Sequence, residues 1–368
     1  MDHTLLRAID RQSSEPAHRQ VREMIRECIV TGALTPGEKL LSEPELAEVL
    51  GVSRMTANKA ILSLVAEGWL MRTKGKGTFV AAPARQTRHG FAVVVAEEIS
   101  RAVNNYYFGA LYLGLVERAA ASGYDLSLLN LADVLDHPER VAAFDGAVFI
   151  NPPQRAMPAL ATALAGLRSH VVLGATWSGC GGTCVDSDNI LGVGLAVGHL
   201  ADLGHRIIGF VGGCPHDANT IDRVRGFELA CRLRGLESDT DIPLSPEAIE
   251  LSAPAIDALR ERLRSPNRPT GWVVAGAVLA LQFARVAFDL GLKIPDDLSL
   301  VAYDDPAFLA AFEPALTTIR QPLAEMASVA FDELLRRCEA PYADPVLRYC
   351  RPELVARQST SAPPVPPT

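Results

Sequence analysis

The chain has 368 residues, of which 48% are hydrophobic and 21% charged, and this ordinary globular mixture is long enough for two or three domains. Its apolar runs are shorter than the roughly 20 residues that a membrane-spanning helix needs, and its first residues lack the basic-then-apolar order of a secretory signal. Seven scattered cysteines without a Cys-x-x-Cys pair exclude a disulfide framework, so we expect reduced thiols in a cytoplasmic protein with no metal or cofactor.

Charge is distributed unevenly along the chain. The net charge of −8 excludes a protein that coats nucleic acid over its whole length. Residues 1–80 hold 11 Lys and Arg and 10 Asp and Glu residues, which leaves 24 basic and 33 acidic residues of the chain's 35 and 43 for the rest. The N-terminal part has a net charge of +1 and the rest −9, and an acidic body carrying a locally basic head is typical of a protein that contacts DNA at one place.

The N-terminal elements predict the first half of a helix-turn-helix. Apolar residues recur at helical spacing over 16–31, and Gly32 ends that helix. Ser42, followed three residues later by Glu45, has the form of a capping box. The short helix that it begins is expected to end at Gly51, because glycine takes a positive φ without strain.

The recognition helix is predicted to begin after Ser53, whose hydroxyl can cap its first turn. No Asp or Glu occurs between Ser53 and Ala66, as a helix beside DNA phosphates requires. Two short strands then flank the basic, glycine-rich segment 73–77, which predicts a wing that can approach a phosphate closely. The residues expected to contact DNA are Ser42, Ser53, Arg54, Thr56, Asn58, Lys59, Lys74, Gly75, Lys76 and Gly77.

This part contains five short motifs, each occurring once: Leu34-x-Pro36-Gly37-x-Lys39-Leu40, Ser42-Glu43-x-Glu45-Leu46-Ala47, Val52-Ser53-Arg54-x-Thr56, Ala66-Glu67-Gly68 and Gly75-x-Gly77-Thr78-Phe79-Val80. They resemble the N-terminal domain of the GntR family of bacterial transcription regulators, which implies that residues 1–80 form a winged helix-turn-helix DNA-binding domain. Two positions depart from the family pattern, because Leu41 stands where Pro is common and Asn58 where Arg is common. Asn pairs with adenine and Arg with guanine, so the family's base preference is not carried over.

After a linker over 81–89 without apolar periodicity, strands alternate with helices. This alternation predicts an α/β domain with parallel sheets, in which ligands bind beyond the carboxyl ends of the strands. Strands are expected near 91–96, 126–130, 146–150, 171–173, 207–211, 272–274 and 298–303. Helices are expected near 107–122, 155–167, 190–203, 222–234, 253–264, 277–290 and 323–338.

The second part carries its own ordered motifs: Asn105-Tyr-Tyr-Phe108, Val185-Asp-Ser-Asp-Asn189, Leu203-Gly-His-Arg-x-Ile-x-Phe-Val-Gly-Gly213, Arg223-x-x-Gly226-Phe227, Gly291-Leu-x-Ile-Pro-Asp-Asp-Leu-Ser299, Tyr303-Asp304-Asp305 and Leu316-Thr-Thr-Ile-Arg-Gln-Pro322. Residues 90–358 therefore resemble the effector domain of LacI/GalR repressors, which has a type I periplasmic-binding-protein-like fold. The resemblance implies two doubly wound parallel-sheet subdomains joined by three crossovers, an effector between them, and a homodimer. A GntR-type head on this body is similar to arabinose-repressor-type regulators. Residues 359–368 are expected to form a disordered tail.

The same resemblance implies an effector site formed by Tyr107, Phe108, Asn151, Arg223 and Asp304. The two aromatic rings would stack on an apolar ring face, Arg223 would donate to hydroxyls or a carboxylate, and Asp304 would accept from hydroxyls or an amine. This combination suits a sugar. The structural alternatives are core packing for the aromatic rings, a solvated helix start for Arg223 and a turn for Asp304.

One family feature is missing from this set. The family usually carries an acid within the segment 273–277, where this chain has Ala277 after Gly276. The usual sugar contacts are therefore incomplete. Trp177, like Asn151, follows a predicted strand and is a further candidate for a ligand contact.

The leading hypothesis is a sequence-specific transcription regulator, a repressor, that binds double-stranded operator DNA as a homodimer under the control of a sugar-like effector. The alternative is a solute-binding or sensor protein of the periplasmic-binding-protein type that does not touch DNA, which the wing and the missing secretory signal disfavour. An enzyme is not expected, because the sequence has no Gly-x-Ser-x-Gly elbow, Walker loop or zinc-type His/Glu spacing.

Overall fold

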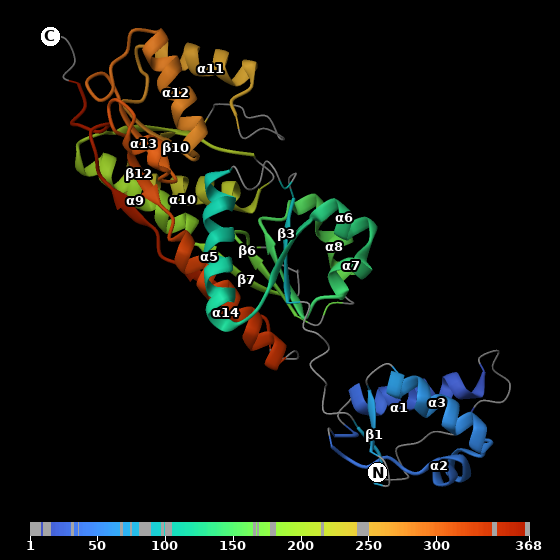
Figure 1. Ribbon diagram of the computed structural model, residues 1–368. Coiled ribbons are helices and arrows are strands. Elements are labelled where there is room, and N and C mark those ends of the chain that lie inside the picture. Colours follow the sequence, from blue (N-terminus) through green and yellow to red (C-terminus); the bar gives the residue numbers. More distant parts are fainter. Residues whose placement is uncertain are drawn as a thin grey trace. The chain divides into compact units, whose positions relative to one another are not determined.

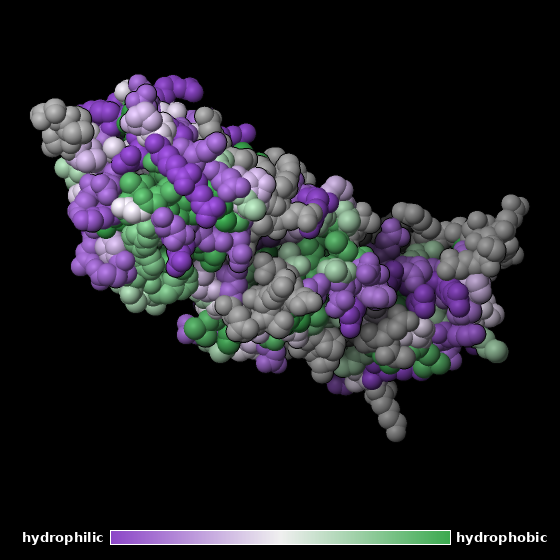
Figure 2. Space-filling model, turned by 90° about the horizontal axis from the view of Figure 1, so that it is seen from above, coloured by the Kyte–Doolittle hydropathy of each residue, from purple (hydrophilic) through white to green (hydrophobic). Residues whose placement is uncertain are grey.

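The computed structural model divides the chain into two compact units, Met1–Arg88 and His89–Thr368, called the head and the body below. The expected linker over 81–89 lies outside the described residues, and no helix in the described part is long and apolar enough to cross a membrane. Hydrophilic side chains cover much of the face seen in Figure 2, with groups of apolar side chains between them. The structure describes residues 9, 16–30, 33–35, 37–66, 69–73, 76–80, 90–96, 99, 105–164, 167, 169–176, 182–214, 217–240, 250–340 and 344–364.

The described residues of the head form three helices and a two-stranded antiparallel sheet (Figure 1). Side chains from all five elements meet in one core, in which Leu46, Ile61 and Leu64 are fully buried. Full burial of such a side chain stabilises the fold by about 1.5–3 kcal/mol, so the helical spacing of apolar residues holds the helices together. The predicted winged helix-turn-helix is confirmed, with elements α1 (Ala17–Val30), α2 (Glu43–Leu50), α3 (Arg54–Ala66), β1 (Leu70–Thr73) and β2 (Gly77–Val80).

Local caps determine where α2 and α3 begin and end. The Ser42 hydroxyl accepts from the Glu45 N–H (3.5 Å) and the Glu45 carboxylate accepts from the Ser42 N–H (2.8 Å), which confirms the capping box. Gly51 ends α2 with φ 64°, a conformation that costs residues with a Cβ about 1–2 kcal/mol. The Thr56 N–H donates to the Ser53 hydroxyl (3.1 Å), so Ser53 caps α3 as predicted.

The body contains two α/β lobes, each built on a six-stranded sheet. In the N-terminal lobe the strands are parallel and lie in the order β13-β7-β6-β5-β3-β4. Helices α5 and α14 pack side by side on one face of this sheet (Figure 1), and α6, α7 and α8 cover the other. The strands are β3 (Phe91–Val95), β4 (Leu126–Asn130), β5 (Gly146–Ile150), β6 (His170–Leu173), β7 (Thr183–Ser187) and β13 (Leu347–Cys350). The helices are α5 (Tyr106–Ser122), α6 (Leu131–Asp136), α7 (Pro138–Ala142), the short 3-10 helix η2 (Gln154–Ala156), α8 (Met157–Leu164) and α14 (Leu323–Glu339).

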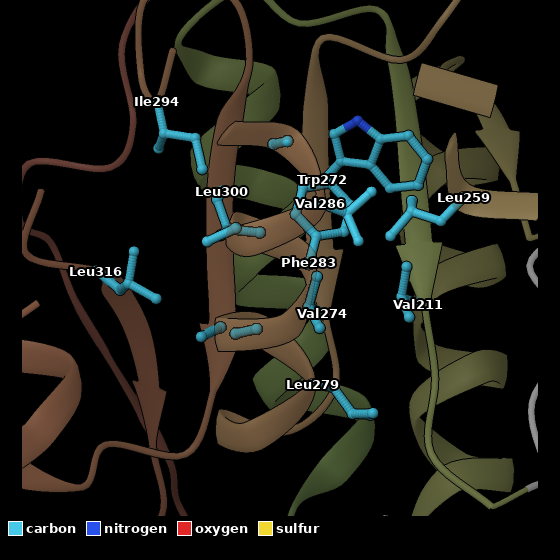
Figure 3. Packing of buried hydrophobic residues seen from close by; sticks show 14 of the residues in the cluster. Val211, Leu259, Trp272, Val274, Leu279, Phe283, Val286, Ile294, Leu300 and Leu316 are labelled. Carbon is cyan, nitrogen blue, oxygen red and sulfur yellow. The ribbon is translucent and has the colours of Figure 1, made fainter. Parts of the chain in front are cut away.

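In the C-terminal lobe the strand order is β14-β12-β11-β10-β8-β9, and only β14 is antiparallel to its neighbour. Helices α9 and α10 contribute to the core on one face, and α11, α12 and α13 to the core on the other. Figure 3 shows part of the core on the face covered by α11, α12 and α13. There Trp272 of β10 packs against Phe283 of α12, with ring centroids 5.1 Å apart. The strands are β8 (Ile207–Val211), β9 (Glu237–Asp239), β10 (Gly271–Val274), β11 (Ser299–Tyr303), β12 (Thr317–Arg320) and β14 (Glu353–Val355). The helices are α9 (Asn189–Asp202), α10 (Ala218–Arg234), α11 (Ala253–Arg264), α12 (Ala277–Asp289) and α13 (Ala307–Ala310).

The described chain passes between the lobes after Ser187 of β7, after Arg320 of β12 and after Cys350 of β13. These are the three crossovers that the family resemblance implies, and the predicted α/β class with two parallel-sheet subdomains is confirmed. The sequence analysis missed β7, β9, β12, β13 and β14 and the helices α6, α7 and α13, all of which are short.

The prediction that the tail is disordered from residue 359 is wrong for its first residues. Ser359 is fully buried, and its hydroxyl accepts from the Thr317 N–H (2.8 Å) while it donates to the Leu300 carbonyl (2.5 Å). The Ser361 N–H donates to the Ser299 hydroxyl (2.9 Å). These bonds to β11 and β12 satisfy the polar groups of 359–361 and tie them to the lobe. Residues 365–368 lie outside the described residues.

Candidate DNA interface and effector site

Helix α3 has one buried and one exposed face. Ala57, Ala60 and Ile61 are fully buried and anchor the helix in the core of the head. The opposite side carries the polar and basic residues that the sequence analysis selected. Of these, Ser53, Arg54 and Lys59 are exposed, whereas Thr56 and Asn58 are half-buried.

The side chains on this face differ in how firmly they are held. The hydroxyls of Ser53 and Thr56 lie 2.8 Å apart and bond to each other. Asn58 has a buried amide oxygen with no hydrogen-bond partner among the described residues, so its amide is the less constrained group. Met55 is 83% exposed. The sequence analysis passed over it because only polar and basic side chains were weighed as DNA contacts.

Basic residues of α1 lie close to α3. The pKa of His18 is lowered first by desolvation and then by the positive charge of Lys59, with smaller effects of Arg19 and Arg22. The first turns of α1 and the middle of α3 therefore share one region of positive charge, which favours binding of phosphates. The sequence analysis treated α1 only as a supporting helix.

The wing is joined to α2 by an ion pair between Arg72 of β1 and Glu43 of α2. Gly77 has φ +118°, and a Cβ built there would lie 2.8 Å from the Lys39 Cε atom. Glycine is favoured here by this positive φ, whereas the end of the Lys39 side chain could move aside for a Cβ. Lys39 is thus a basic group beside the wing that the sequence analysis did not assign to DNA contact.

The remaining residues of the predicted DNA surface are placed as follows. Ser42 is exposed at the start of α2, and Lys76 and Gly77 are exposed at the start of β2. Lys74 and Gly75 lie outside the described residues.

In the body, two residues that directly follow strands adopt the left-handed conformation. Asn151 follows β5 with φ 41°, and Asp304 follows β11 with φ 75°. Such backbone strain costs non-glycine residues about 1–3 kcal/mol and is concentrated at binding sites. The Asn151 N–H donates to the Leu173 carbonyl (2.8 Å) and the Asp304 N–H to the Ile319 carbonyl (2.8 Å). Each strained residue is therefore held at the carboxyl end of its own sheet.

The Asp304 carboxylate joins the two lobes. It accepts hydrogen bonds from the Tyr106 hydroxyl of the N-terminal lobe (2.5 Å) and from the Gln321 side-chain amide (2.5 Å). Burial, followed by the charge of Asp304, raises the pKa of Tyr106 well above its ordinary value, so this phenol remains a donor. Tyr106 and Gln321 were not selected from the sequence, although both lie within the quoted motifs.

Arg223 of α10 is 7% exposed, which excludes the solvated helix start considered for it. Its Nε donates to the Asn189 Oδ1 atom (2.8 Å) and one of its terminal nitrogens to the Ala275 carbonyl (3.2 Å). Its guanidinium lies over the Tyr303 ring, 3.8 Å from the centroid, a cation–π arrangement. The group is thereby fixed between α9, α10 and the end of β11.

Two asparagines bridge the lobes beside Arg223. Asn189 of α9 donates to the Asp186 carboxylate (3.3 Å), and Asn219 of α10 donates to the Gly174 carbonyl (2.8 Å). Burial raises the pKa of Asp186 to about 7, although the Ser187 N–H bond to it (2.8 Å) and the charge of Arg223 act in the opposite direction. Asp186 and Asn189 lie within the quoted motif Val185-Asp-Ser-Asp-Asn189 but were not selected as site residues, and Asn219 lies outside every quoted motif.

Tyr107 and Phe108 have different surroundings. Phe108 is 7% exposed and packs in the core of the N-terminal lobe, so the alternative of core packing holds for its ring. The Tyr107 hydroxyl is buried and has no hydrogen-bond partner among the described residues. Gly174, at φ +79°, makes room for it, because a Cβ there would lie 2.3 Å from that hydroxyl oxygen.

The position where the family carries an acid belongs to an apolar core in this chain. Ala277 is 1% exposed and packs in the cluster that Figure 3 shows in part. Trp177 lies outside the described residues. Among the residues that the structure describes, no group of three or more His, Cys, Asp or Glu could hold a metal ion.

Comparisons with known proteins agree with this division into head and body. The family described as "Bacterial regulatory proteins, gntR family" matches residues 17–80, and the "Periplasmic binding protein-like domain" matches residues 197–360. The chain is 30% identical over 365 residues to the arabinose metabolism transcriptional repressor of Geobacillus stearothermophilus, covering 95% of this chain and 99% of that protein. A second protein of that description, from Halalkalibacterium halodurans, is 27% identical over 374 residues, 94% and 97% of the two chains.

A solved structure supports the fold of the body. The LacI family transcriptional regulator from Mycobacterium smegmatis superposes with a TM-score of 0.64 at 27% sequence identity. The match covers 74% of this chain and 99% of that one.

Proposed function

Because this chain belongs to the family of bacterial transcriptional repressors that includes the arabinose metabolism repressor of Geobacillus stearothermophilus, we propose that it represses transcription by binding specific operator DNA under the control of a small-molecule effector. The observation that carries the proposal is the match over 95% of this chain and 99% of that repressor, which spans both head and body. We propose that it has no catalytic activity of its own and that it acts in the cytoplasm, where bacterial operators lie.

The head supplies the groups that contact DNA in this proposal. In a helix-turn-helix the recognition helix lies in the major groove, and phosphate contacts fix its register. Arg54 and Lys59 are the exposed basic groups of α3, and Asn58 can pair with adenine. We propose that Lys76 and Lys39, both exposed, contact phosphates beside the wing. Two heads in a homodimer would read two half-sites one helical turn apart.

The body supplies the effector site, which we place between the lobes around Arg223, Asp304, Tyr107 and Asn151. Arg223 and Asp304 offer a donor and an acceptor within one buried region. Asp304 directly follows β11, and Arg223 of α10 donates to the carbonyl of Ala275, directly after β10, so both lie near the carboxyl ends of parallel strands, where such sheets bind ligands. The names of the relatives connect them with arabinose metabolism, so a sugar is the effector class that we propose. The effector acts through its unequal affinity for two lobe arrangements.

DNA binding is tested first. A random duplex library is enriched on the purified full-length protein, and the enriched duplex is titrated by fluorescence anisotropy. Arg54→Ala should weaken binding by roughly 5- to 150-fold, because one good base contact contributes about 1–3 kcal/mol. Arg232→Ala removes the same charge from an exposed position on α10 of the body and should leave the affinity unchanged. Equal affinity of wild type and Arg54→Ala would remove Arg54 from the DNA-reading role.

Effector control is tested on the same duplex. Addition of L-arabinose or another uncharged sugar should change its dissociation constant at least fivefold, the lower end of common allosteric coupling. Failure to enrich any duplex would contradict the proposed repressor itself. An enriched duplex whose affinity no sugar changes would contradict only the effector class.

A further inference from the structure

We propose that Asp186, together with the hydroxyls of Tyr107, Ser187 and Tyr303, forms a second polar wall of the effector site that binds uncharged hydroxyl groups and excludes anionic ligands. This inference rests on the proposed function and adds a specificity-determining residue to it. The wall is distinct from the Arg223 and Asp304 side chains that the family resemblance implies.

The first observation is a group of buried hydroxyls, one of which has no partner. The side-chain oxygens of Tyr107, Ser187 and Tyr303 are buried. The Ser187 hydroxyl is close enough to the Tyr303 phenol to bond to it, whereas the Tyr107 hydroxyl has no hydrogen-bond partner among the described residues. Ser187 and Tyr303 are 0% exposed. Leaving a buried hydroxyl unpaired costs about 1–3 kcal/mol. The unpaired Tyr107 hydroxyl, beside the Ser187 and Tyr303 hydroxyls, indicates a ligand whose own polar atoms complete this region.

The second observation is that these groups converge on Asp186. The pKa of Tyr107 is raised by burial first and then by the charges of Asp186 and Asp304, so its phenol lies near both carboxyls. Ser187 follows Asp186 in β7, and a hydrogen bond between its hydroxyl and the Tyr303 phenol lowers the pKa of that phenol, against the larger effect of burial, which raises it. Gly192 leaves the space for that phenol, because a Cβ there would lie 2.5 Å from its oxygen.

The third observation is the balance of charge. Arg223 is a cation that acts on both Asp186 and Asp304. The nearby Asp222, which pairs with Arg225 (3.7 Å), and Asp188 raise the pKa of Asp186 further, after burial. An entering phosphate or carboxylate would therefore meet more negative than positive charge in a poorly solvated region, where charges interact strongly. A hydroxyl carries no net charge and can both donate and accept.

The existing contact of Asp304 shows which kind of partner this region holds. Its carboxylate is satisfied by a phenol hydroxyl, from Tyr106, and by a neutral amide, from Gln321. The hydroxyl of a bound sugar, like the Tyr106 phenol, can donate a hydrogen bond to a carboxylate. The wall around Asp186 has the same composition of carboxyl and hydroxyl groups, but its Tyr107 hydroxyl still lacks a partner among the described residues.

The test is isothermal titration of the full-length protein, without DNA, with L-arabinose and D-ribose as uncharged probes and D-arabinose 5-phosphate and D-ribose 5-phosphate as anionic probes. The wild type should bind an uncharged pentose at least tenfold more tightly than either phosphate. Tyr107→Phe removes one hydroxyl without changing the ring, and it should weaken pentose binding about tenfold. Tyr112→Phe, on the same helix α5 but packed against the core of the N-terminal lobe, should bind as wild type does.

Asp186 is charged above its pKa of about 7, so the titrations are run at pH 8, where Asp186→Asn removes that charge from the wall. It should weaken pentose binding at least tenfold and reduce the preference over the phosphates at least tenfold. Tyr107→Phe provides the second, conservative variant if Asp186→Asn does not fold. The inference would be overturned by any of three results: pentose binding that is unchanged in both variants, phosphate binding as tight as pentose binding in the wild type, or no pentose binding at all. These titrations contain no DNA, so their outcome does not depend on duplex enrichment. A failed enrichment would contradict the proposed repressor, whereas a failed titration would contradict only this inference.

Discussion

Replacing Asp186 by Asn should change how the stability of the body depends on pH. Asp186 is 0% exposed, and burial raises its pKa from the ordinary 3.8 to about 7. The folded protein keeps this proton up to about pH 7, whereas the unfolded chain releases it near pH 4. Between these values the folded state binds more protons, so its free energy of unfolding falls as the pH rises. Asn carries no charge and lacks this dependence.

The magnitude follows from the size of the pKa change. One pKa unit corresponds to about 1.4 kcal/mol, so the rise from 3.8 to about 7 amounts to about 4 kcal/mol between the protonated and the charged form. The free energy of unfolding of Asp186→Asn minus that of the wild type should therefore grow by about 1.4 kcal/mol per pH unit between pH 5 and 7. Above the pKa the difference should become constant.

The assay is urea denaturation of both proteins at several pH values from 5 to 8, followed by tryptophan fluorescence, because Trp272 is fully buried in the body. Other titrating groups are common to both proteins, so they cancel in the difference. Asp257→Asn is the matched control, since that carboxyl is 74% exposed and pairs with Arg260 on the surface. Its curve should run parallel to that of the wild type. A parallel curve for Asp186→Asn as well would refute the reasoning.

Two further predictions separate the roles of head and body. Ile61→Ala removes a fully buried side chain from the core of the head, so it should cost about 2–5 kcal/mol and abolish duplex binding in the anisotropy assay. Sugar titrations should be unaffected, and an equal loss of both activities would contradict the independence of the two units. Gly174→Ala puts a Cβ 2.3 Å from the Tyr107 hydroxyl at φ +79°, so pentose affinity should fall by more than tenfold while duplex binding stays. Retention of pentose affinity would show that this hydroxyl need not occupy its observed position.

The head was predictable from the sequence because its elements are set by local interactions. The capping box of Ser42 and Glu45, the left-handed Gly51 and the cap at Ser53 each involve residues within a few positions of one another. Helical spacing of apolar residues then defines which side of α3 is buried. Lys39 was missed because its position beside Gly77 depends on the pairing of the wing with a segment 38 residues away in the chain.

Several strands of the body were not predictable because pairing, rather than local pattern, makes them strands. In β7, Asp186 and Ser187 are polar yet fully buried, so the apolar run expected of a central parallel strand is interrupted. In β12, Thr317 and Thr318 are likewise buried, and Thr318 pairs with Val355 of β14. The ladder bonds to neighbouring strands satisfy these segments, and a single sequence does not display such long-range partners.

The effector site was predictable only where a residue directly follows a recognisable strand or a family motif. Asp304 and Arg223 were selected in this way, and their effector contacts remain predictions. Tyr106, Asp186 and Asn189 come from three elements, and only the packing of the two lobes brings them to the same region. The strained backbone of Asp304 could not be predicted from the sequence either, because its φ of 75° is held by the hydrogen bond from its N–H to the neighbouring strand.

Residues of the proposed effector site lie next to the segments that cross between the lobes. Asp186 and Ser187 end β7 just before the first crossing, and Gln321 directly follows β12 at the second. The Asp188 N–H donates to the Cys350 carbonyl (3.0 Å), which ties the first crossing to the third. A change in the angle between the lobes must alter the backbone at these crossings, because they are the covalent connections between the lobes in the described chain. A ligand bonded to Asp186 therefore has different contacts in two lobe arrangements, and this difference in affinity is what an effector needs to shift the equilibrium between them.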